Sequence, residues 1–404
     1  MFSKFRRIIR ALRTTRISFR ILRQAPVVLV YQDGFEVLSK FIDPSLISII
    51  DPSKPNFWVV LKCLVSRKHG LNSYTAEVIK AQNPIVVITF IDNDTSFYFL
   101  KSLTPAPLYI AIQNGIRNNY AYSHREGFVD HLEKSGGKDQ LTADIICTFG
   151  ESSSIFFERF IQSRTLVTGN LKNNLMKIAN PIEPQYDIVF VSQHAPFDLA
   201  RCEETMFLNE VSISLNDFYE IERSVSKFLA QFCSDNSLHF AVSGKRGAED
   251  VFERQFFEEA IGEIPFTFLP RTDAYSSYEN CINSRVVVVI DSTIGYELLS
   301  RGKKVAFFSA RLFNPLIDQR ELEDSFFGYP GTYPVEGPFW TNKPNHNEYV
   351  RILDSLLRMT DTEWAAEIRP YTEDLMAYRP DNKEFIQMLH DQGIQTRNED
   401  SRRA

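Results

Sequence analysis

The feature that most constrains the fold is a series of short, nearly continuous apolar runs separated by helix-like segments. In the first half of the chain these runs, several of which end in polar residues, are VVLVY (27–31), LISII (46–50), FWVVL (57–61), PIVVITFIDND (84–94), PLYIAIQNGIR (107–117), ADIICTFGE (143–151) and RTLVTGN (164–170). Strands read this way when helices cover both faces of a parallel sheet. The pattern therefore predicts a Rossmann-like α/β domain.

The same alternation restarts after IANPIEPQY (178–186), a stretch with two prolines and no periodicity, which is typical of a linker. The second set of runs is YDIVFVSQ (186–193), LHFAVSGKR (238–246), PFTFLPR (265–271), VVVVIDST (286–293) and KVAFFS (304–309). A chain of 404 residues accommodates two domains of ordinary size. We therefore predict an α/β protein in which two Rossmann-like domains face a cleft. The predicted parts are a basic segment (1–23), an N-terminal domain (24–180), a C-terminal domain (186–345), helices (346–392) and a disordered tail (393–404).

The first 23 residues form a basic amphipathic segment. They carry eight Lys or Arg side chains and no acid, and the whole chain has a formal net charge of −6, so the remainder carries −14 (−6 − 8). This charge asymmetry favours contact with an anionic membrane surface. Packing of the same helix on the protein body is the alternative. A nucleic acid is not expected as a partner, because the acidic body would repel it.

Composition restricts the compartment. Five cysteines are scattered without a CxxC pair, and no apolar run approaches the roughly 18–20 residues of a membrane span. We therefore expect a cytoplasmic protein in a reducing environment, peripheral on the inner face of the cytoplasmic membrane.

Candidate site residues follow the strands of the predicted N-terminal domain, because ligands of parallel sheets bind beyond the carboxyl ends of strands. The candidate catalytic carboxylates, as base or nucleophile, are Asp92, Asp94 and Glu151. The candidates for binding hydroxyl groups or a carboxylate of a substrate are Gln113, Asn114 and Arg117. Loop capping, a first-turn acid at the start of a helix and a metal-binding DxD pattern are the alternatives. No metal site is predicted, because the histidines lack HxH or HxxxH spacing.

In the predicted C-terminal domain, an apolar run leads into DSTIGYELLSRGKK (291–304). A helix that starts at Ser292 and Thr293 offers backbone N–H groups and hydroxyls to a phosphate. Gly295 would let the ligand approach closely, and Glu297 would accept hydrogen bonds from a ribose. Simple N-capping with a solvated Glu297 is the alternative.

Further polar residues end the other strands of this domain. Lys245, Arg246 and Arg271 are candidate phosphate-binding cations, with plain surface charges as the alternative, and His194 is a candidate base or phosphate partner. No GxxxxGK[ST] occurs, and no GxGxxG follows the first strand, which disfavours ATP hydrolysis and NAD chemistry. No cofactor is expected.

Five segments carry a resemblance to a known group of proteins. They are TFIDNDTSFYFLK (89–101), IAIQNGIR (110–117), CTFGE (147–151), DSTIGYELLSRGKKVAFF (291–308) and GPFWTN (337–342). Between about residues 26 and 360 the chain resembles GT-B glycosyltransferases, and more narrowly bacterial O-antigen and capsule biosynthesis proteins, including β-Kdo transferases. The resemblance implies a nucleotide-sugar as co-substrate, with its nucleotide in the C-terminal domain, an acceptor in the N-terminal domain and metal-independent transfer.

The expected function is transfer of a sugar, with Kdo from CMP-Kdo as one donor, to a lipid-linked or oligosaccharide acceptor in surface polysaccharide or lipopolysaccharide biosynthesis. Two alternatives stay open. One is a non-catalytic sugar-nucleotide-binding protein of the same fold, and the other is a sugar-nucleotide epimerase.

Overall fold

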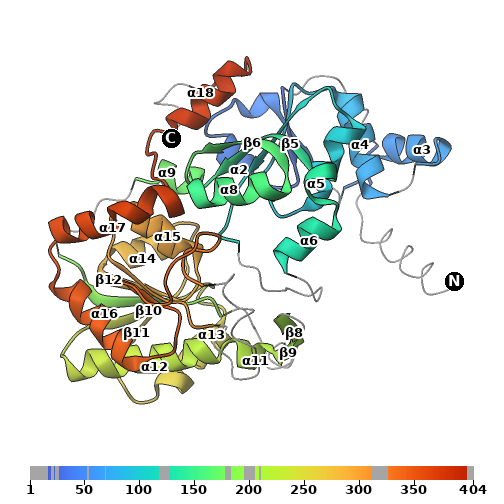
Figure 1. Cartoon of the computed structure of the whole chain (residues 1–404). Coiled ribbons are helices and arrows are strands. Elements are labelled where there is room, and N and C mark those ends of the chain that lie inside the picture. Colours follow the sequence, from blue (N-terminus) through green and yellow to red (C-terminus); the bar gives the residue numbers. More distant parts are fainter. Residues whose placement is uncertain are drawn as a thin grey trace, which may run out of the picture.

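Two lobes make up the protein in the computed structural model (Figure 1). The structure describes residues 17–19, 22, 27–51, 54–68, 70–117, 127–177, 183–194, 205–208, 211–311 and 326–397. The predicted basic segment therefore lies mostly outside the described residues, as do positions 178–182 of the predicted linker and 398–404 of the predicted tail.

The N-terminal lobe is built on a parallel sheet, as predicted, and this sheet has six strands. Its strands, in spatial order, are β2 (Ile47–Ile50), β1 (Val28–Tyr31), β3 (Val86–Thr89), β4 (Leu108–Ile112), β5 (Thr142–Thr148) and β6 (Gln162–Val167). The helices of this lobe are α2 (Phe35–Leu38), α3 (Phe57–Val65), α4 (Leu71–Gln82), α5 (Thr95–Leu103), α6 (Phe128–Lys134), α7 (Gly137–Gln140), α8 (Glu151–Phe160) and α9 (Leu171–Leu175). The apolar run FWVVL (57–61) adds no strand, because it lies in helix α3. The strand order reverses between β1 and β3.

The C-terminal lobe repeats this architecture. Its parallel strands, in spatial order, are β11 (Thr267–Leu269), β10 (Phe240–Ser243), β7 (Tyr186–Val191), β12 (Ser284–Val289), β13 (Val305–Phe308) and β14 (Trp340–Thr341). Counted along the lobe this order is 3-2-1-4-5-6, the doubly wound topology of dinucleotide-binding sheets. The helices are α11 (Leu215–Phe218), α12 (Glu220–Asp235), α13 (Val251–Ile261), α14 (Ser276–Ile282), α15 (Thr293–Ser300) and α16 (His346–Arg358). An antiparallel hairpin of β8 (Thr205–Leu208) and β9 (Val211–Ser214) was not expected from the sequence.

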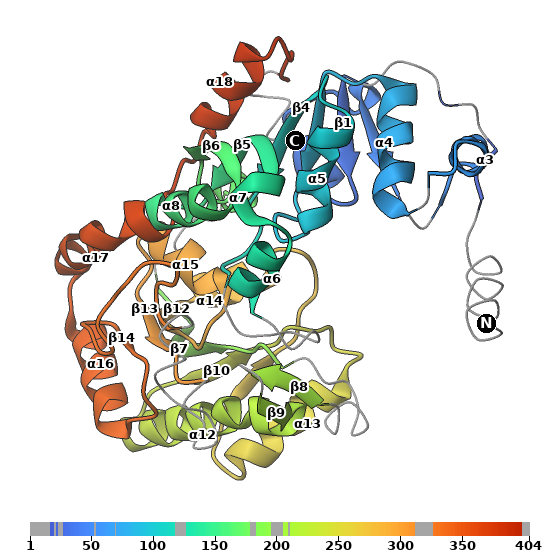
Figure 2. The same ribbon diagram turned by 45° about the vertical axis from the view of Figure 1, so that its right-hand side comes forward.

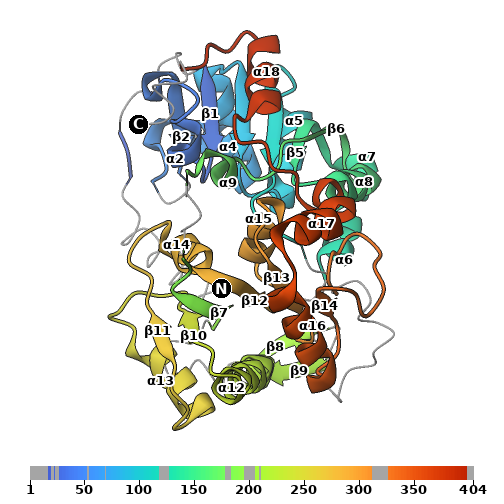
Figure 3. The same cartoon turned by 90° about the vertical axis from the view of Figure 1, so that its left-hand side faces the viewer.

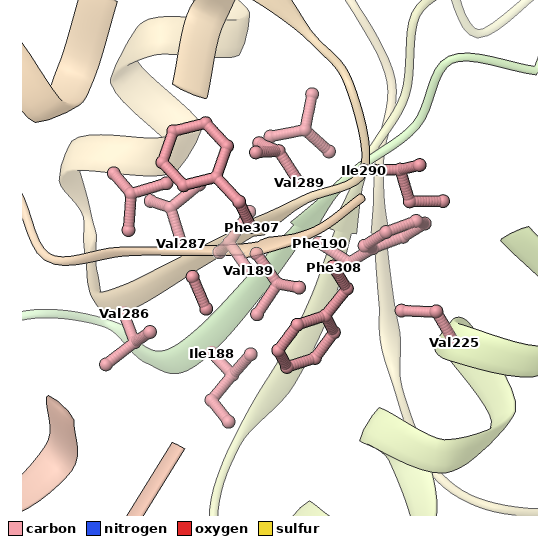
Figure 4. Packing of buried hydrophobic residues seen from close by; sticks show 14 of the residues in the cluster. Ile188, Val189, Phe190, Val225, Val286, Val287, Val289, Ile290, Phe307 and Phe308 are labelled. Atoms are coloured by element: carbon pink, nitrogen blue, oxygen red, sulfur yellow. The ribbon is translucent and has the colours of Figure 1, made fainter. Parts of the chain in front are cut away.

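Burial on both faces explains why the strands of this lobe are apolar throughout. Val286 to Val289 of β12 are fully buried, between β7 and β13 and beneath helices on each side of the sheet. Figure 4 shows these side chains interleaved with Phe190, Phe307 and their neighbours. A polar side chain on either face would have no hydrogen-bond partner in this core. Among the described helices, none combines the length and hydropathy needed to cross a membrane.

The C-terminal helices cross from one lobe to the other, which the sequence pattern did not indicate. α17 (Asp361–Leu375) starts at a capping box and packs on α8 of the N-terminal lobe. α18 (Lys383–Asp391) then lies wholly on that lobe (Figures 1 and 3). Its Phe385 packs edge-on against Phe41, with ring centroids 5.1 Å apart. The N-terminal core is therefore completed by the other end of the chain.

Gly169 tests how tightly the segment between α17 and α18, here called the crossing segment, packs against the N-terminal lobe. Its φ is +67°, and a Cβ there would lie 2.0 Å from the carbonyl oxygen of Ala377. Gly262 has a similar φ of +71° but no neighbour within 4 Å of such a Cβ. Gly262→Ala should therefore cost about 1 kcal/mol of unfolding free energy through backbone strain alone. Gly169→Ala should cost roughly 2 kcal/mol more, because the backbone contact between the lobes must open.

Urea unfolding of the two variants, followed by tryptophan fluorescence, measures this difference. Equal losses would show that the crossing segment is not packed tightly at this glycine.

Candidate functional site

The carboxyl ends of the two sheets meet between the lobes. The loop after β4 reaches the start of α15, where the backbone N–H of Ile116 donates to Thr293 Oγ1 at 3.2 Å. A second contact joins α9 to the rim of the C-terminal sheet, since Lys172 Nζ donates to the carbonyl of Ala274 at 3.3 Å. In Figure 2 α15 and α14 lie on the side of the C-terminal lobe that faces the N-terminal lobe. The structure thus brings the loop after β4 and the start of α15, which both carry candidate residues, to one interface.

Asp92, Asn114 and Arg117 form one cluster at the mouth of the N-terminal sheet. Arg117 Nε donates to Asp92 Oδ2 at 2.8 Å, and the Arg117 guanidinium also donates to the other carboxylate oxygen. The Asn114 backbone N–H donates to Asp92 Oδ1 at 3.1 Å, and the Asn114 side-chain oxygen accepts from Arg117 at 2.7 Å. Asp92 is 0% exposed, so its carboxylate orients Arg117 and presents no surface to an acceptor.

The carboxylate of Asp94 and the amide of Gln113 are also engaged within the lobe. Asp94 Oδ1 caps α5 through the backbone N–H of Ser96 at 2.9 Å, and Oδ2 accepts from Tyr31 and Gln32. Burial, and then the charge of Asp94, raise the pKa of Tyr31 above its ordinary value. Gln113 is buried and accepts from the backbone N–H of Phe149 at 2.8 Å, which braces the loop after β4. No group of three potential metal ligands gathers among the residues that the structure describes.

Glu151 differs from the two aspartates. It is the first residue of α8, it is exposed, and it has no side-chain partner among the described residues. Its neighbour Ser152 donates to Asp374 Oδ1 of α17 at 2.6 Å, so the start of α8 is held in place. Of the three candidate carboxylates, Glu151 is the one that can receive a proton without breaking a contact within the described chain.

The three predicted cations of the C-terminal lobe line one open pocket of about 900 Å³. Its charged lining residues are Lys245, Arg246, Glu249, Asp250, Arg271 and Asp273. The carboxylate of Glu253, which is fully buried, accepts from the backbone N–H groups of Lys245 and Arg246 at 2.9 and 3.0 Å. This carboxylate fixes the turn that presents both cations. The Arg271 backbone N–H donates to the Arg246 carbonyl at 2.7 Å, which brings the third cation alongside.

A buried ion triad lies beneath the start of α15. Arg311 donates to Asp291 at 2.6 and 3.0 Å and to Glu222 at 2.9 and 2.5 Å. Burial raises the pKa of Glu222 to about 7, against the opposing effect of Arg311. Asp291 therefore pairs with an arginine and does not cap the helix. No sequence pattern predicts this triad, because its members are far apart in the chain and belong to different elements.

At the start of α15, Ser292 is the N-cap, but its side chain makes no capping hydrogen bond. Gly295 does not face a ligand as expected, since a Cβ there would lie 2.5 Å from Val289 and 3.0 Å from Phe307. Its missing side chain lets the helix pack closely on the sheet.

Glu297 is held between the lobes, and its carboxylate is not open to a ribose in this arrangement. It is 4% exposed, and its two oxygens accept from Asn170 Nδ2 at 2.6 Å and from the Tyr278 hydroxyl. Burial raises its pKa, and the hydrogen bond from Tyr278 opposes this shift. Asn173 of α9 donates to the Glu297 carbonyl at 3.2 Å. The residue thus anchors α15 to the N-terminal lobe.

His194 is buried behind the cationic pocket. It is 1% exposed and stacks on Phe256 with ring centroids 4.0 Å apart, and Tyr219 packs against its edge. Burial, followed by the charges of Arg223 and Arg246, lowers its pKa to about 3. Its Nδ1 has no hydrogen-bond partner among the residues that the structure describes. A neutral imidazole in this position supports the wall of the pocket and offers no surface to a substrate.

Comparison with known families identifies the group to which the protein belongs. Residues 110–393 match the family described as "putative O-antigen biosynthesis protein". The chain belongs to this family. The match spans the β4 loop, the cationic pocket, α15 and the crossing helices. No curated protein gives a significant match to the sequence.

Solved structures show the same two-lobed fold at low sequence identity. The S. aureus MnaA–UDP co-structure has 11% identity and a TM-score of 0.52, covering 94% of this chain and 97% of that one. The crystal structure of a "putative UDP-N-acetylglucosamine 2-epimerase" from Listeria monocytogenes has 14% identity and a TM-score of 0.51, with coverage of 91% and 97%. A variant of the wall teichoic acid polymerase TagF has 9% identity and a TM-score of 0.50, with coverage of 97% and 98%. The predicted GT-B architecture is confirmed.

The buried His194 predicts a pH dependence of stability. Because its pKa is lowered from 6.5 to about 3, the folded state binds fewer protons than the unfolded state between these values. Its contribution to stability is present above pH 6.5 and is lost as the pH falls toward 3. Wild type should therefore lose about 1.4 kcal/mol per pH unit more than His194→Phe below pH 6.

Urea unfolding over a pH series measures these slopes. His239→Gln is the control, because His239 is an exposed histidine on the same lobe and its replacement should leave the slope unchanged. Parallel profiles for wild type and His194→Phe would contradict the assignment of a buried neutral imidazole.

Proposed function

We propose that the protein is a glycosyltransferase of O-antigen biosynthesis that moves a sugar from a nucleotide donor to a lipid-linked or oligosaccharide acceptor. One observation supports this most directly: a pocket at the carboxyl ends of the C-terminal strands is lined by three cations together with three carboxylates, one of which, Asp250, pairs with Arg246 at 2.9 Å. The opposing lobe presents a carboxylate, Glu151, with no partner among the described residues. Transfer from a nucleotide needs both groups, one for the leaving phosphate and one for the acceptor.

The donor is assigned to the C-terminal lobe. The negative charge on the phosphate grows as the sugar–oxygen bond breaks, and fixed cations stabilise it at that stage. Glu253 holds the backbone of Lys245 and Arg246 in place before the donor arrives, so little reorganisation is needed. The start of α15 adds backbone N–H groups and the positive end of the helix dipole. With these charges in place the proposed reaction is metal-independent. Kdo from CMP-Kdo is one donor that fits the proposal.

The acceptor is assigned to the N-terminal lobe. Arg117, oriented by Asp92 and Asn114, lies beside Thr293 of α15 and is placed to bind an anionic or hydroxyl group of the acceptor sugar. Glu151 is the proposed base, or the nucleophile if the anomeric configuration is retained. Asp92 and Asp94 then serve as positioning residues, because their oxygens are engaged within the lobe.

The epimerase alternative keeps a specific observation in its favour. One structure with the same fold is named as an epimerase. An epimerase would release an isomerised nucleotide-sugar without any acceptor, whereas a non-catalytic binder would show no turnover. Product analysis with and without an acceptor oligosaccharide separates the three proposals.

The cations of the pocket predict nucleotide affinity. Arg246→Ala and Arg271→Ala should each weaken binding of the cognate nucleotide-sugar about tenfold or more, since a charge-assisted hydrogen bond contributes ~1.5–3 kcal/mol. A thermal-shift panel of CMP-, UDP-, GDP- and dTDP-sugars finds the donor, because a ligand of the folded state raises the melting temperature. Calorimetric titration then gives the affinities.

Arg254→Ala is the matched control, because Arg254 lies on the exposed surface of α13, is paired with Glu258, and does not line the pocket. If it weakened binding as much as the pocket variants do, the donor would not lie in this pocket.

The proposed base predicts a loss of transfer without loss of donor binding. Glu151→Gln should lower the rate of transfer about 100-fold or more, because the amide cannot accept the proton. The nucleotide affinity should not change. Glu158→Gln is the control, because Glu158 is two turns further along the exposed face of α8 and bonds only Thr165 among the described residues. If Glu151→Gln transferred sugar at the wild-type rate, Glu151 would be neither the base nor the nucleophile.

A further inference from the structure

α3 has an unusual distribution of apolar side chains for a surface helix. Only Val59 and Cys63 of its nine residues are buried. Trp58 is 50% exposed, Leu64 59% and Val65 78%. A helix on an aqueous surface normally turns polar residues outward. A contiguous exposed apolar patch of this kind marks a site of interaction.

A second segment extends the same patch. The Ser18 backbone N–H donates to the carbonyl of Pro55 at 2.9 Å, and the Phe57 N–H donates to the carbonyl of Ser18 at 2.8 Å. The Trp58 indole donates to the carbonyl of Phe19 at 3.0 Å, and the rings of Phe19 and Phe57 lie 5.1 Å apart. The exposed apolar side chains form one surface, here called the α3 face: Ile17, Phe19, Trp58, Leu61, Leu64 and Val65.

The sequence around the α3 face is basic. Residues 1–23 carry eight cations, residues 52–76 carry four (Lys54, Lys62, Arg67 and Lys68), and neither stretch contains an acid. The rest of the chain therefore carries −18 (−6 − 12). Lys62 and Lys68 reach Glu77 at 2.8 and 2.9 Å, and their hydrogen bonds lower the pKa of that carboxyl to about 2. Lys54 in turn lies 3.1 Å from Asp51, so the four cations of this stretch are accompanied by two carboxylates and keep a positive excess, to which the sequence of residues 1–23 adds eight cations.

We propose that the α3 face is a docking surface for an anionic lipid bilayer. In this arrangement the exposed indole and aliphatic side chains enter the headgroup region, and the lysines and arginines meet the lipid phosphates. This combination of exposed apolar and basic side chains is the one that such a surface recognises. Residues 1–23 are expected to contact an anionic membrane, and the proposal adds the side chains of the α3 face to this contact. It does not depend on the transferase activity.

Two other occupants fit the charges less well. A second copy of the chain, packed face to face, would bring two basic surrounds together, and like charges across an interface are unfavourable. Folding of residues 1–16 over the α3 face would add six cations (Lys4, Arg6, Arg7, Arg10, Arg13 and Arg16) beside Lys62 and Arg67. An anionic surface is the occupant that offsets this charge.

Vesicle co-sedimentation of the full chain tests the proposal. The probes are vesicles of phosphatidylcholine mixed with phosphatidylglycerol, and vesicles of phosphatidylcholine alone. Wild type should bind the anionic vesicles and bind them less as salt is raised. The double variant Leu64→Gln with Val65→Gln should bind about tenfold more weakly, because both side chains lose their transfer into the bilayer. Both are exposed in the folded protein, so the melting temperature should not change.

The control is Ile155→Gln with Val350→Gln, which removes two exposed aliphatic side chains from α8 and α16. It should bind vesicles as wild type does. Undiminished binding by the α3 variant, equal binding of wild type to neutral vesicles, or no binding at all would overturn the proposal. A wild-type dimer that the α3 variant converts to a monomer, without vesicle binding, would assign the surface to a second copy. None of these results bears on transfer, because no donor or acceptor is present.

Discussion

The carboxylate of Glu297 sets the relation between the two lobes. It is buried at their junction, where Asn170 of the N-terminal lobe and Tyr278 of the C-terminal lobe each donate to one of its oxygens. A buried carboxylate without such partners would cost several kcal/mol. Both hydrogen bonds form only when the two lobes keep the arrangement seen in the structure. Glu297 is on α15, the helix whose start meets the β4 loop. The same contact therefore also holds the start of α15 next to that loop.

Buried carboxylates serve a common purpose elsewhere in the site. Asp92 orients Arg117, Glu253 holds the backbone of Lys245 and Arg246, and the Arg311 triad supports the loop that leads into α15. In each case the carboxylate is buried and paired, and it holds a cation or a backbone turn in position. Sites built this way keep their donors in place before the ligand binds, which is the arrangement that stabilises a developing charge. The cost of burying these charges is offset by their hydrogen bonds.

The sequence was sufficient to predict the sheets, because strands buried on both faces must be apolar along their whole length. It also located the cations of the pocket, since polar residues directly after such strands lie at the ligand-binding edge. The sequence could not distinguish exposed carboxylates from buried ones. Asp92 and Glu151 both follow strands, yet one is enclosed by Arg117 and the other is exposed. That difference depends on contacts across the lobe, which have no local pattern.

The same reasoning explains the other discrepancies. Gly295 fits a phosphate-binding turn and a closely packed helix equally well by sequence, and only the side chains of Val289 and Phe307 decide between them. The helices α17 and α18 are periodic wherever they pack, so their periodicity does not show which lobe they cover. Exposure of α3 is likewise invisible in the sequence, because an apolar run such as FWVVL (57–61) usually indicates a buried element.

The position of α3 links the proposed membrane surface to the proposed acceptor site. The helix follows the carboxyl end of β2, and in a parallel sheet this is the same edge from which the loops bearing Asp92 and Arg117 emerge. A bilayer seated on the α3 face would therefore lie beside the lobe to which the acceptor is assigned. A lipid-linked acceptor could keep its apolar chain in the bilayer while its sugar reached the cleft. A free oligosaccharide would gain nothing from this arrangement, so the two proposals together favour the lipid-linked acceptor.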